Sequence, residues 1–337
     1  MDASVQGAVA SVIVPSHRGA HRLRVLLPAL ARQEIGEPWE VVVALDGTLD
    51  ESPDILAEWA DRLPLVVTAT TEPQGVVAAL NRGYGVATGR VLIRCDDDLE
   101  PGPDMVRRHV DHHRGRDDLG VIGATRDVFP DTPYAAVYGR RANERGLAAA
   151  YVRPAPLRWI GWAAHNSVTR ATWDRLGGFD RRFIYGQDSE LGVRLAEGGI
   201  EIITDPELEL PHHGPSTTTA TRIPRAFVSG ASQILFSEVH PGSRPSPGRP
   251  RGLKATSYDL VVRSVTGTVR SREAFAKIGQ WTDLALPRLP KSVGSILVEV
   301  LVDAAGRSGR AHGTSDLAAY KGQKVDELTR ERQHPHD

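Results

Sequence analysis

The chain has 337 residues and only one cysteine, Cys95, which lies in the apolar run VLIRC. A single thiol cannot form a disulfide within the chain, so a disulfide-stabilised scaffold is excluded. A lone cysteine in an apolar run is typical of a small buried residue in a reducing compartment. The first residues, MDASVQGAVA, lack the basic start and the long apolar stretch of a secretion signal. We therefore expect a cytoplasmic protein.

The sequence also lacks an excess of charge and a long hydrophobic run. Its 41 basic and 42 acidic side chains give a formal net charge of -1. No overall field therefore attracts nucleic acid or anionic lipid, and such a partner would need a local patch. The longest apolar stretch near the C-terminus, 293–306, contains Glu299 and Asp303 and is shorter than the roughly 18 residues of a membrane-spanning helix. We expect no nucleic-acid partner and no transmembrane span.

The first half of the chain alternates strand-like and helix-like patterns, which predicts an α/β fold with a mostly parallel sheet covered by helices on both faces. The expected strands are 11–15, 39–45, 63–69 and 91–95, and the expected helices are 23–33, 54–63 and 76–87. Right-handed crossovers would bring the loops 15–19, 46–50, 71–75 and 96–98 to the carboxyl edge of the sheet, where such sheets bind ligands.

The texture changes after residue 240, where PGSRPSPGRPRG offers little to bury. We expect an α/β domain over 1–240, a linker over 241–252, a helical region over 253–312 and a polar tail over 313–337. Within the helical region, 258–272 and 290–305 have helical patterns. Plain core packing is the favoured role of the helical region. Three alternatives are a part of the acceptor-substrate site, a homodimer contact and a face that touches a membrane peripherally. The membrane role would use the apolar residues 293–302 and their basic flanks Arg288, Lys291 and Arg307.

An acidic cluster, CDDDL at 95–99, directly follows the fourth predicted strand. In an extended chain, residues two apart point the same way, so Asp96 and Asp98 can present carboxylates to one ion while Asp97 faces elsewhere. Carboxylate oxygens suit Mg²⁺ or Mn²⁺, which keep open positions for substrate phosphates. The alternative is an acidic turn, but three aspartates at the end of a core strand repel one another without a cation. We therefore predict a metal site here.

Four segments resemble, in order and spacing, the family 2 glycosyltransferases with the GT-A fold. They are SVIVPSHRG at 11–19, VVVALDGTLDES at 41–52, GVVAALNRGYGVATGRVLIRCDDD at 75–98 and GGFDRRFIYGQDSELGVRLAEGG at 177–199. Each is weak alone, but together they extend the resemblance over about residues 11–216. It implies that a sugar moves from a nucleoside-diphosphate sugar, with a UDP-sugar expected, to an acceptor hydroxyl with inversion, and that Mn²⁺ or Mg²⁺ is the cofactor.

The resemblance also implies a set of donor contacts. The carboxylate of Asp46 would accept a hydrogen bond from the base, although Leu45 stands where many members have a second aspartate. Arg82 would neutralise phosphate charge. A turn at Asp46, a surface position for Arg82 and a loop-forming role for Gly75 are the structural alternatives. The residues expected to contact the donor nucleotide are Pro15, His17, Arg18, Asp46, Gly75, Asn81, Arg82, Asp96 and Asp97.

Asp188, in QDSELGVRL, matches the family's acidic motif, in which the aspartate deprotonates the acceptor hydroxyl. The resemblance therefore implies that Asp188 is the general base, which must lie within hydrogen-bond reach of the attacking oxygen. Capping of the following helix is the structural alternative, and both roles can coexist. Gln187 replaces the glutamate that commonly precedes this aspartate.

Two further groups come from the resemblance. The first lines the sugar and acceptor cleft, with core packing as the alternative for its aromatic members. Its residues are Trp159, Trp162, His165, Asn166, Gly178, Phe179, Asp180 and Gln187. The second is a late histidine that completes the metal site with Asp98 and Asp96. In ELPHHGPST at 209–217 we choose His213, with His212 second.

Two alternatives remain beside the glycosyltransferase. A nucleotidyltransferase would also use paired carboxylates and a metal, but it usually has a glycine-rich basic loop after its first strand, and PSHRGAH is poor in glycine. A catalytically silent binding protein of the same fold would keep the donor site without turnover. The sequence has no Walker A motif, dinucleotide fingerprint, serine elbow or paired Cys-x-x-Cys. The acceptor stays unidentified.

Overall fold

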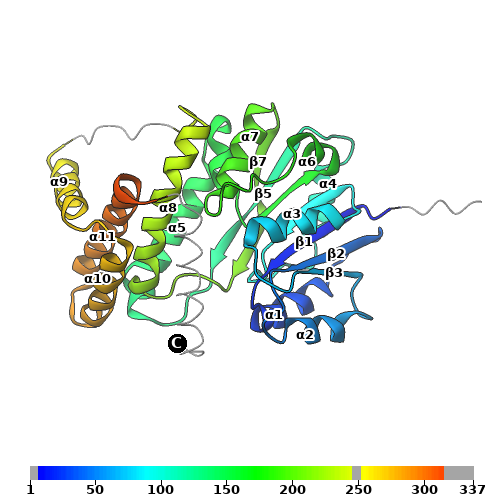
Figure 1. Cartoon of the computed structure of the whole chain (residues 1–337), viewed down its shortest axis with the longest axis horizontal. Helices are drawn as coiled ribbons and strands as arrows, with labels where there is room; N and C mark the ends of the chain where they lie inside the picture. The colour runs from blue at the N-terminus through cyan, green and yellow to red at the C-terminus, as the bar shows by residue number, and fades with distance from the viewer. Residues whose placement is uncertain (1–6, 245–251, 315–337) are drawn as a thin grey trace, which may run out of the picture. The chain divides into compact units, whose positions relative to one another are not determined.

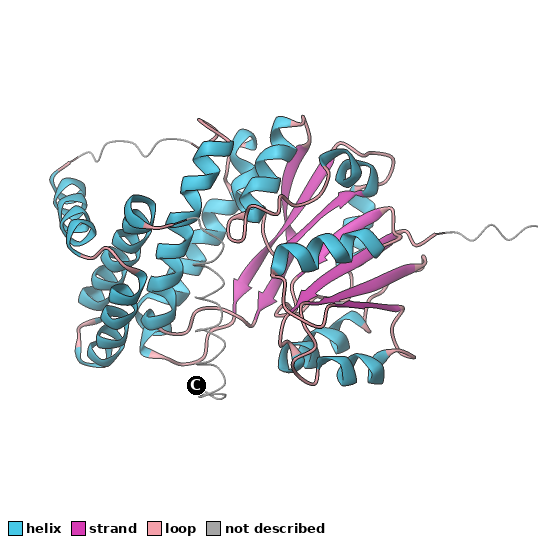
Figure 2. Cartoon of the chain, in the orientation of Figure 1, coloured by secondary structure: helices cyan, strands magenta, loops and turns pink. Residues whose placement is uncertain are grey.

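A computed structural model describes residues 7–244 and 252–314. The chain divides into two compact units (Figures 1 and 2). Unit 1 contains residues 7–128, 142–181 and 187–215, and unit 2 contains residues 129–141, 182–186, 216–244 and 252–314. Residues 245–251 of the expected linker and 315–337 of the expected tail lie outside the described residues.

Unit 1 is built on a seven-stranded sheet with the order β3-β2-β1-β4-β6-β5-β7. All neighbouring strands are parallel except that β6 runs antiparallel to β4 and β5. The first four strands confirm the predicted α/β alternation. The strands are β1 (Ala10–Ser16), β2 (Trp39–Leu45), β3 (Leu65–Ala69), β4 (Val91–Cys95), β5 (Leu119–Asp127), β6 (His165–Thr169) and β7 (Glu201–His212).

Helices cover both faces of this sheet, as expected. Along β1 and β4 the side chains alternate between the two faces of the sheet. Val12, Val14 and Cys95 point to one face, where they pack in an apolar cluster with α1, α2 and α4, and the thiol of Cys95 is buried. Arg94 points to the opposite face, where Tyr84 of α3 stacks on Trp173 of α6 at 3.8 Å between ring centroids. The helices of unit 1 are α1 (Ala20–Leu30), α2 (Ser52–Trp59), α3 (Val76–Val86), α4 (Met105–His112), η2 (Ala155–Gly161), α6 (Arg170–Leu176), α7 (Gln187–Glu197) and most of α5 (Arg140–Tyr151).

Unit 2 is helical. Its elements are η1 (Ala135–Gly139), α8 (Thr219–Val239), α9 (Leu253–Thr268), α10 (Arg272–Ala285), η3 (Leu286–Arg288) and α11 (Lys291–His312). The two predicted C-terminal helices correspond to α9 and α11, whereas α10 was not predicted. The expected boundary at residue 240 is also corrected, because α8 packs against α10 and α11 and so belongs to unit 2.

Glycines allow α8 and α11 to pack with their backbones in contact. A Cβ atom added at Gly230 would lie 1.9 Å from the carbonyl oxygen of Gly306, and one added at Gly309 would lie 1.9 Å from that of Phe227. Both neighbours are backbone atoms, which cannot move without moving a helix. The packing of unit 2 therefore depends on the absence of side chains at this crossing.

Replacing Gly230 by alanine should destabilise unit 2. We expect Gly230→Ala to lower the free energy of unfolding by about 1–3 kcal/mol, because α8 and α11 would have to separate to accept the methyl group. Urea denaturation measures the change. Gly267→Ala in α9 is the matched control, since nothing lies within 4 Å of its added Cβ and alanine favours a helix by up to about 1 kcal/mol over glycine. Equal free energies of unfolding for the two variants would contradict the close contact of α8 and α11 at Gly230.

Candidate active site

A buried arginine joins two of the predicted site carboxylates. Arg94, on β4, donates from Nε to Asp96 Oδ1 at 2.8 Å and from Nη2 to Asp96 Oδ2 at 3.1 Å. Its Nη1 donates to Oδ1 of Asp188, at the start of α7. The Arg94 side chain is 3% exposed, whereas Asp96 and Asp188 are 25% and 22% exposed. Asp96, which is expected at the sugar donor, and Asp188, the expected base, therefore lie against the same guanidinium. Part of each carboxylate is open to solvent.

The surroundings of Arg94 fix it in place. Its Cζ atom lies 6.0 Å from the centroid of the Phe179 ring, which packs edge-on against Tyr84 and Trp173. Burial alone would lower the pKa of Arg94, but the charges of Asp188 and Asp96 raise it, so the guanidinium stays charged. A buried cation of this kind is stable only while its carboxylate partners are present.

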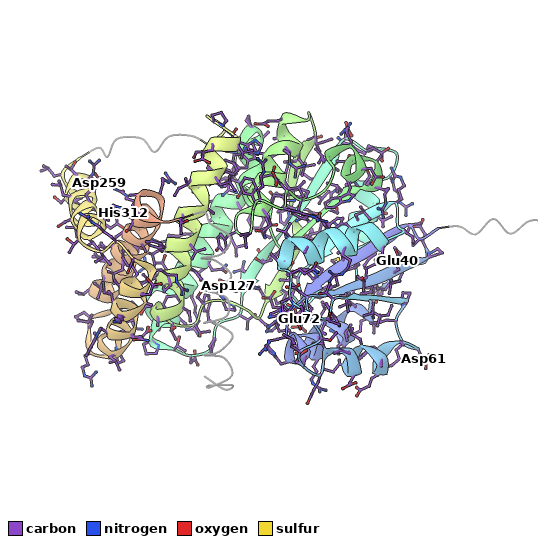
Figure 3. All side chains as sticks on the ribbon, viewed as in Figure 1. Glu40, Asp61, Glu72, Asp127, Asp259 and His312 are labelled. Carbon is purple, nitrogen blue, oxygen red and sulfur yellow. The ribbon has the colours of Figure 1, made fainter. Side chains whose placement is uncertain are left out.

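A second cluster joins Asp98 to a histidine. Nε2 of His212 lies 3.2 Å from Asp98 Oδ2, and its Nδ1 lies 2.6 Å from Oδ1 of Asp127, which is labelled in Figure 3. Burial would lower the pKa of His212, but the hydrogen bonds to Asp127 and Asp98 raise it to about 9. Burial would in turn raise the pKa of Asp98, and the hydrogen bond and charge of His212 lower it.

Strand register explains how these residues meet. Asp127 and His212 are directly paired across the parallel strands β5 and β7. The turn after β4 pairs with the end of β7, because the amide of Glu100 donates to the Pro211 carbonyl at 3.0 Å and that of His213 donates to the Asp98 carbonyl at 2.8 Å. The backbone therefore holds the predicted acidic turn against the predicted histidine segment.

The arrangement fits a divalent cation that is also held by a substrate diphosphate. Among residues 7–244 and 252–314 no group of three or more His, Cys, Asp or Glu side chains is placed to hold a metal ion. Asp98 and His212 can supply two ligands, and Mg²⁺ and Mn²⁺ commonly use one or two carboxylates plus phosphate oxygens. Asp127 accepts the Nδ1 proton of His212, the second-shell contact typical of metal-binding histidines. Burial raises the pKa of Asp96 to about 6 despite the opposing charge of Arg94, so a nearby cation would favour its charged form.

The structure separates the two histidine candidates. His213, our first choice for a metal ligand, places Nε2 3.0 Å from Glu100 Oε2, while His212 faces Asp98. Adjacent residues of an extended segment point to opposite sides, so only one of the pair can face the acidic cluster. The preference for His213 over His212 is corrected on this geometry.

Asp97 and the first loop form a connected edge of the site. Ser16 Oγ donates to Asp97 Oδ2 at 2.6 Å, and Arg22 Nε donates to Asp97 Oδ1 at 2.8 Å. Asp97 thus faces away from Asp96 and Asp98, as expected, and binds β1 and α1 instead of being open to a nucleotide. Burial raises its pKa against the effect of Arg22. Gly19 permits this approach, because its Cβ would lie 2.4 Å from Asp97 Oδ2.

The other expected residues of the first loop lie at the carboxyl end of β1. Pro15 is paired with Ala44 of β2. Nδ1 of His17 lies 2.6 Å from the carbonyl oxygen of Asp46. Arg18 has φ of 48°, an uncommon value for a residue other than glycine. His17 and Arg18 are half-buried, so both retain surface that a nucleotide could contact.

Asp46 shapes the neighbouring loop. Its Oδ1 accepts from the amide of Gln74 at 2.6 Å and its Oδ2 from that of Gly75 at 2.9 Å. Gly75 has φ of 95°, which agrees with its predicted role in freeing the loop before α3. Arg82 donates from Nη2 to the Leu45 carbonyl at 2.7 Å. Asp46 and Arg82 therefore both hydrogen-bond to the backbone. Any contact with a nucleotide would be additional to these bonds.

Asn81 holds the turn that contains Phe179, which differs from the expected contact with the donor. Its Nδ2 donates to the Phe179 carbonyl and its Oδ1 accepts from the Phe179 amide, both at 2.9 Å. Gly178 has φ of 81° and its Cβ would lie 2.8 Å from Asn81 Oδ1. Both functional atoms of the Asn81 amide are therefore engaged by the turn. Asp180, which follows, is half-buried.

Four residues expected in the acceptor cleft are in the core instead. Trp159 and Trp162 are each 2% exposed, and His165 and Asn166 are each 1% exposed. Glycines make room for the tryptophans, because a Cβ at Gly192 would lie 2.6 Å from the Trp159 carbonyl oxygen and 2.8 Å from Trp162 Cβ. The expectation of an open aromatic wall is therefore corrected. Gln187 does reach the site, with Nε2 3.3 Å from Asp188 Oδ2.

His165 belongs to a buried hydrogen-bonded chain below the sheet edge. Its Nε2 lies 2.8 Å from Nε2 of His109, whose Nδ1 lies 2.7 Å from Ser167 Oγ, and Ser167 Oγ also lies 2.8 Å from Nε2 of His113. Burial lowers the pKa of His165 and of His113 to about 4, and it lowers the pKa of His109 well below its usual value. Uncharged, hydrogen-bonded histidines fill this part of the core.

Arg94 and Asp127 are the site residues that sequence reasoning missed. The signal for Arg94 was a charged side chain inside the run VLIRC, directly before three aspartates. A buried arginine requires an anionic partner, so this position could have been singled out. Asp127 carries no such signal, because its pairing with His212 depends on the register of β5 and β7.

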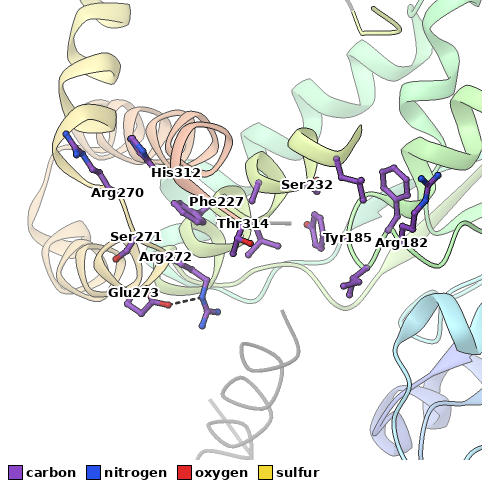
Figure 4. A pocket seen from close by; sticks show the side chains of 16 residues that line it. Arg182, Tyr185, Phe227, Ser232, Arg270, Ser271, Arg272, Glu273, His312 and Thr314 are labelled. Atoms are coloured by element: carbon purple, nitrogen blue, oxygen red, sulfur yellow. Dashed lines mark ion pairs between the residues drawn. The ribbon is translucent and has the colours of Figure 1, made fainter. Parts of the chain in front are cut away.

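All of the predicted site residues belong to unit 1. Unit 2 contains a separate cavity of about 220 Å³, which none of them lines. Figure 4 shows Arg182 and Tyr185 at one end of this cavity and Arg270, Arg272 and His312 at the other. Arg272 lies 3.5 Å from its neighbour Glu273, so part of the positive charge is offset locally.

The comparisons with known proteins concern the family and the fold. The family model of Glycosyl transferase family 2 matches residues 11–162. The chain is similar to the uncharacterized glycosyltransferase YfnE of Bacillus subtilis (strain 168), with 33% identity over 135 residues, which cover 40% of this chain and 33% of that protein. It is 28% identical over 234 residues to the validoxylamine A glucosyltransferase of Streptomyces hygroscopicus subsp. jinggangensis (strain 5008), covering 60% of this chain and 55% of that protein. The matches thus span about a third and about half of these curated relatives.

One solved structure extends the likeness over most of the chain. It is the mannosyltransferase PcManGT from Pyrobaculum calidifontis in complex with GDP-Man and Mn²⁺, with a TM-score of 0.56 and 23% identity over 91% of this chain and 88% of that one. At this identity the likeness shows the fold. Residues 11–162 therefore resemble glycosyl transferase family 2, and the chain has the GT-A fold.

Proposed function

We propose that this protein is a metal-dependent, inverting glycosyltransferase that moves a sugar from a nucleoside-diphosphate sugar to an acceptor hydroxyl. The observation that carries the proposal is the contact of Arg94 with both Asp96 and Asp188. It brings the acidic turn, the expected donor side, next to the expected base. The family match supports a glycosyltransferase and gives no support to the nucleotidyltransferase alternative.

On the donor side, Asp98 and His212 would hold the cation, with Asp96 beside them. When bound, the cation would neutralise charge on the leaving diphosphate. An imidazole ligand beside a carboxylate favours a transition metal, so we propose Mn²⁺ before Mg²⁺. Asp46, His17 and Arg18 line the loops in which the nucleoside would sit. A uridine nucleotide remains our expectation, with guanosine as the alternative because PcManGT is described with GDP-Man.

On the acceptor side, Asp188 would take the proton of the attacking hydroxyl. Arg94 binds Oδ1 of this carboxylate. Gln187 contacts Oδ2, which orients the carboxylate at the first turn of α7. As Asp188 takes the proton, the acceptor oxygen would bond to the anomeric carbon from the face opposite the diphosphate, while the bond from that carbon to the diphosphate breaks, so the configuration is inverted.

Nucleotide binding tests the donor site. We expect UDP or GDP to bind in the presence of Mn²⁺ and much more weakly without it, as measured by isothermal titration. Asp98→Ala and His212→Gln should each weaken the Mn²⁺-dependent binding by at least about tenfold, since outer contacts alone cost 10–100-fold in metal sites.

His213→Gln is the matched control, because His213 is adjacent in sequence but faces Glu100. It should bind like the unaltered protein. If His213→Gln loses the Mn²⁺ effect and His212→Gln keeps it, the assignment of ligands is wrong. If neither nucleotide binds to folded protein, the donor site itself is wrong.

Donor hydrolysis tests the base without knowledge of the acceptor. With Mn²⁺ present, the protein should slowly transfer the sugar of the matching nucleotide sugar to water, measured as release of nucleoside diphosphate. Asp188→Asn should reduce this rate by at least about 100-fold, the usual contribution of a general base, while nucleotide affinity stays within a few-fold.

Asp174→Asn is the matched control. It makes the same carboxylate-to-amide change on the exposed surface of α6, away from the site, and should leave hydrolysis unchanged. Hydrolysis that survives Asp188→Asn would remove Asp188 from the mechanism. Tight Mn²⁺-dependent binding with no hydrolysis in the unaltered protein would instead favour the catalytically silent binding protein.

A further inference from the structure

Unit 2 exposes four large apolar side chains around one helical connection. Trp281 and Leu284, on α10, are 73% and 62% exposed, and Val293 and Ile296, on α11, are 49% and 57% exposed. Each pair is three residues apart, so its members lie on one side of their helix. The short helix η3 joins the end of α10 to the start of α11. Single exposed apolar residues are normal, but a concentration of them marks an interaction surface.

The exposure does not follow from an unpacked helix. The second half of the apolar run 293–302 is buried, with Val298 at 0% and Leu301 at 6% exposed. On α10, Phe275 is 0% exposed and Thr282 is 5% exposed. Both helices therefore have a buried face, and the exposed pair of each helix lies away from that face.

The exposed charges between Trp281 and Ile296, Arg288 and Lys291, are both basic. Residues 272–299 as a whole contain four basic residues, Arg272, Lys277, Arg288 and Lys291, and three acidic ones, Glu273, Asp283 and Glu299. The side chain of Lys277 is also exposed. Asp283 is occupied elsewhere, since its carboxylate accepts from the amides of Thr219 and Ala220 at 2.8 and 3.0 Å. Arg288 donates to the Leu284 carbonyl at 2.7 Å, which holds its guanidinium beside the apolar residues.

We propose that this surface, termed the corner patch and formed by Trp281, Leu284, Val293 and Ile296 with Lys277, Arg288 and Lys291, docks unit 2 on an anionic phospholipid membrane. Tryptophan is favoured at the boundary between lipid headgroups and acyl chains, because its ring is apolar with one polar edge. Basic side chains beside an apolar surface are attracted to anionic headgroups.

A second protein fits the corner patch less well. Lysine is depleted in protein interfaces, and a stable interface needs roughly 20–30 residues a side, far more than this patch provides. Attachment would be peripheral: no helix within residues 7–244 and 252–314 has the length and apolarity to cross a bilayer. The formal net charge of the chain is -1, so the attraction would come from this patch and not from the whole molecule. The proposal does not depend on the glycosyltransferase assignment.

Co-sedimentation with lipid vesicles tests the proposal on the full chain. We expect the protein to bind vesicles of phosphatidylcholine with phosphatidylglycerol, to bind pure phosphatidylcholine more weakly, and to be released by added salt. The double variant Trp281→Ser, Leu284→Ser should reduce the partition coefficient by at least about tenfold. Lys277→Gln with Lys291→Gln should remove most of the preference for the anionic vesicles.

Leu260→Ser with Val261→Ser is the matched control, because these α9 residues are 63% and 51% exposed but lie outside the corner patch. This variant should bind vesicles like the unaltered protein. Absence of vesicle binding, or equal binding by the Trp281 and Leu284 variant, would overturn the proposal. The proposal would also be overturned, in favour of self-association, if the unaltered protein forms concentration-dependent dimers without binding vesicles and the Trp281 and Leu284 variant abolishes these dimers.

Discussion

The ion pairs of Arg94 are the constraint on which the site depends. A guanidinium that is 3% exposed at the end of a core strand needs carboxylates, and it has Asp96 directly after its own strand and Asp188 on α7. Removing either one would leave buried charge uncompensated, which typically costs about 3–5 kcal/mol. The charge balance that stabilises the carboxyl end of β4 therefore also fixes the distance between the two residues proposed for opposite sides of the reaction.

The rest of the site follows from backbone pairing. β5 and β7 run in parallel and place Asp127 beside His212, while the turn after β4 pairs with the end of β7 and brings Asp98 to the same imidazole. A protonated His212 between two carboxylates is stable without a metal. The same three side chains provide an oxygen ligand, a nitrogen ligand and the second-shell contact that a cation would need.

Periodicity and composition predicted the first four strands and the helices between them, because buried parallel strands read as continuous apolar runs. The helix α10 was missed because its buried face is formed by Phe275, Gly279 and Thr282 with Arg272, and only Phe275 is large and apolar. The family resemblance gave separate roles to Asp96 and Asp188, and the structure places both carboxylates against the guanidinium of Arg94.

The failures concern side-chain direction. Trp159 and Trp162 are of a type that suits either a sugar cleft or a core, and the glycines that admit them to the core lie in other elements, at Gly120 and Gly192. The choice between His212 and His213 depended on which face of β7 meets the acidic turn. From the sequence, Arg94 was treated only as part of a strand. An arginine in an apolar run needs an anionic partner, which was not sought.

The most direct test of this account is a crystal structure with Mn²⁺ and the nucleotide that binds, with data collected at the manganese absorption edge. The account predicts an anomalous peak in coordination contact with Asp98 Oδ2, His212 Nε2 and the nucleotide phosphates, with Arg94 still between Asp96 and Asp188. A peak between His213 and Glu100, or bound nucleotide with no manganese near Asp98, would contradict it.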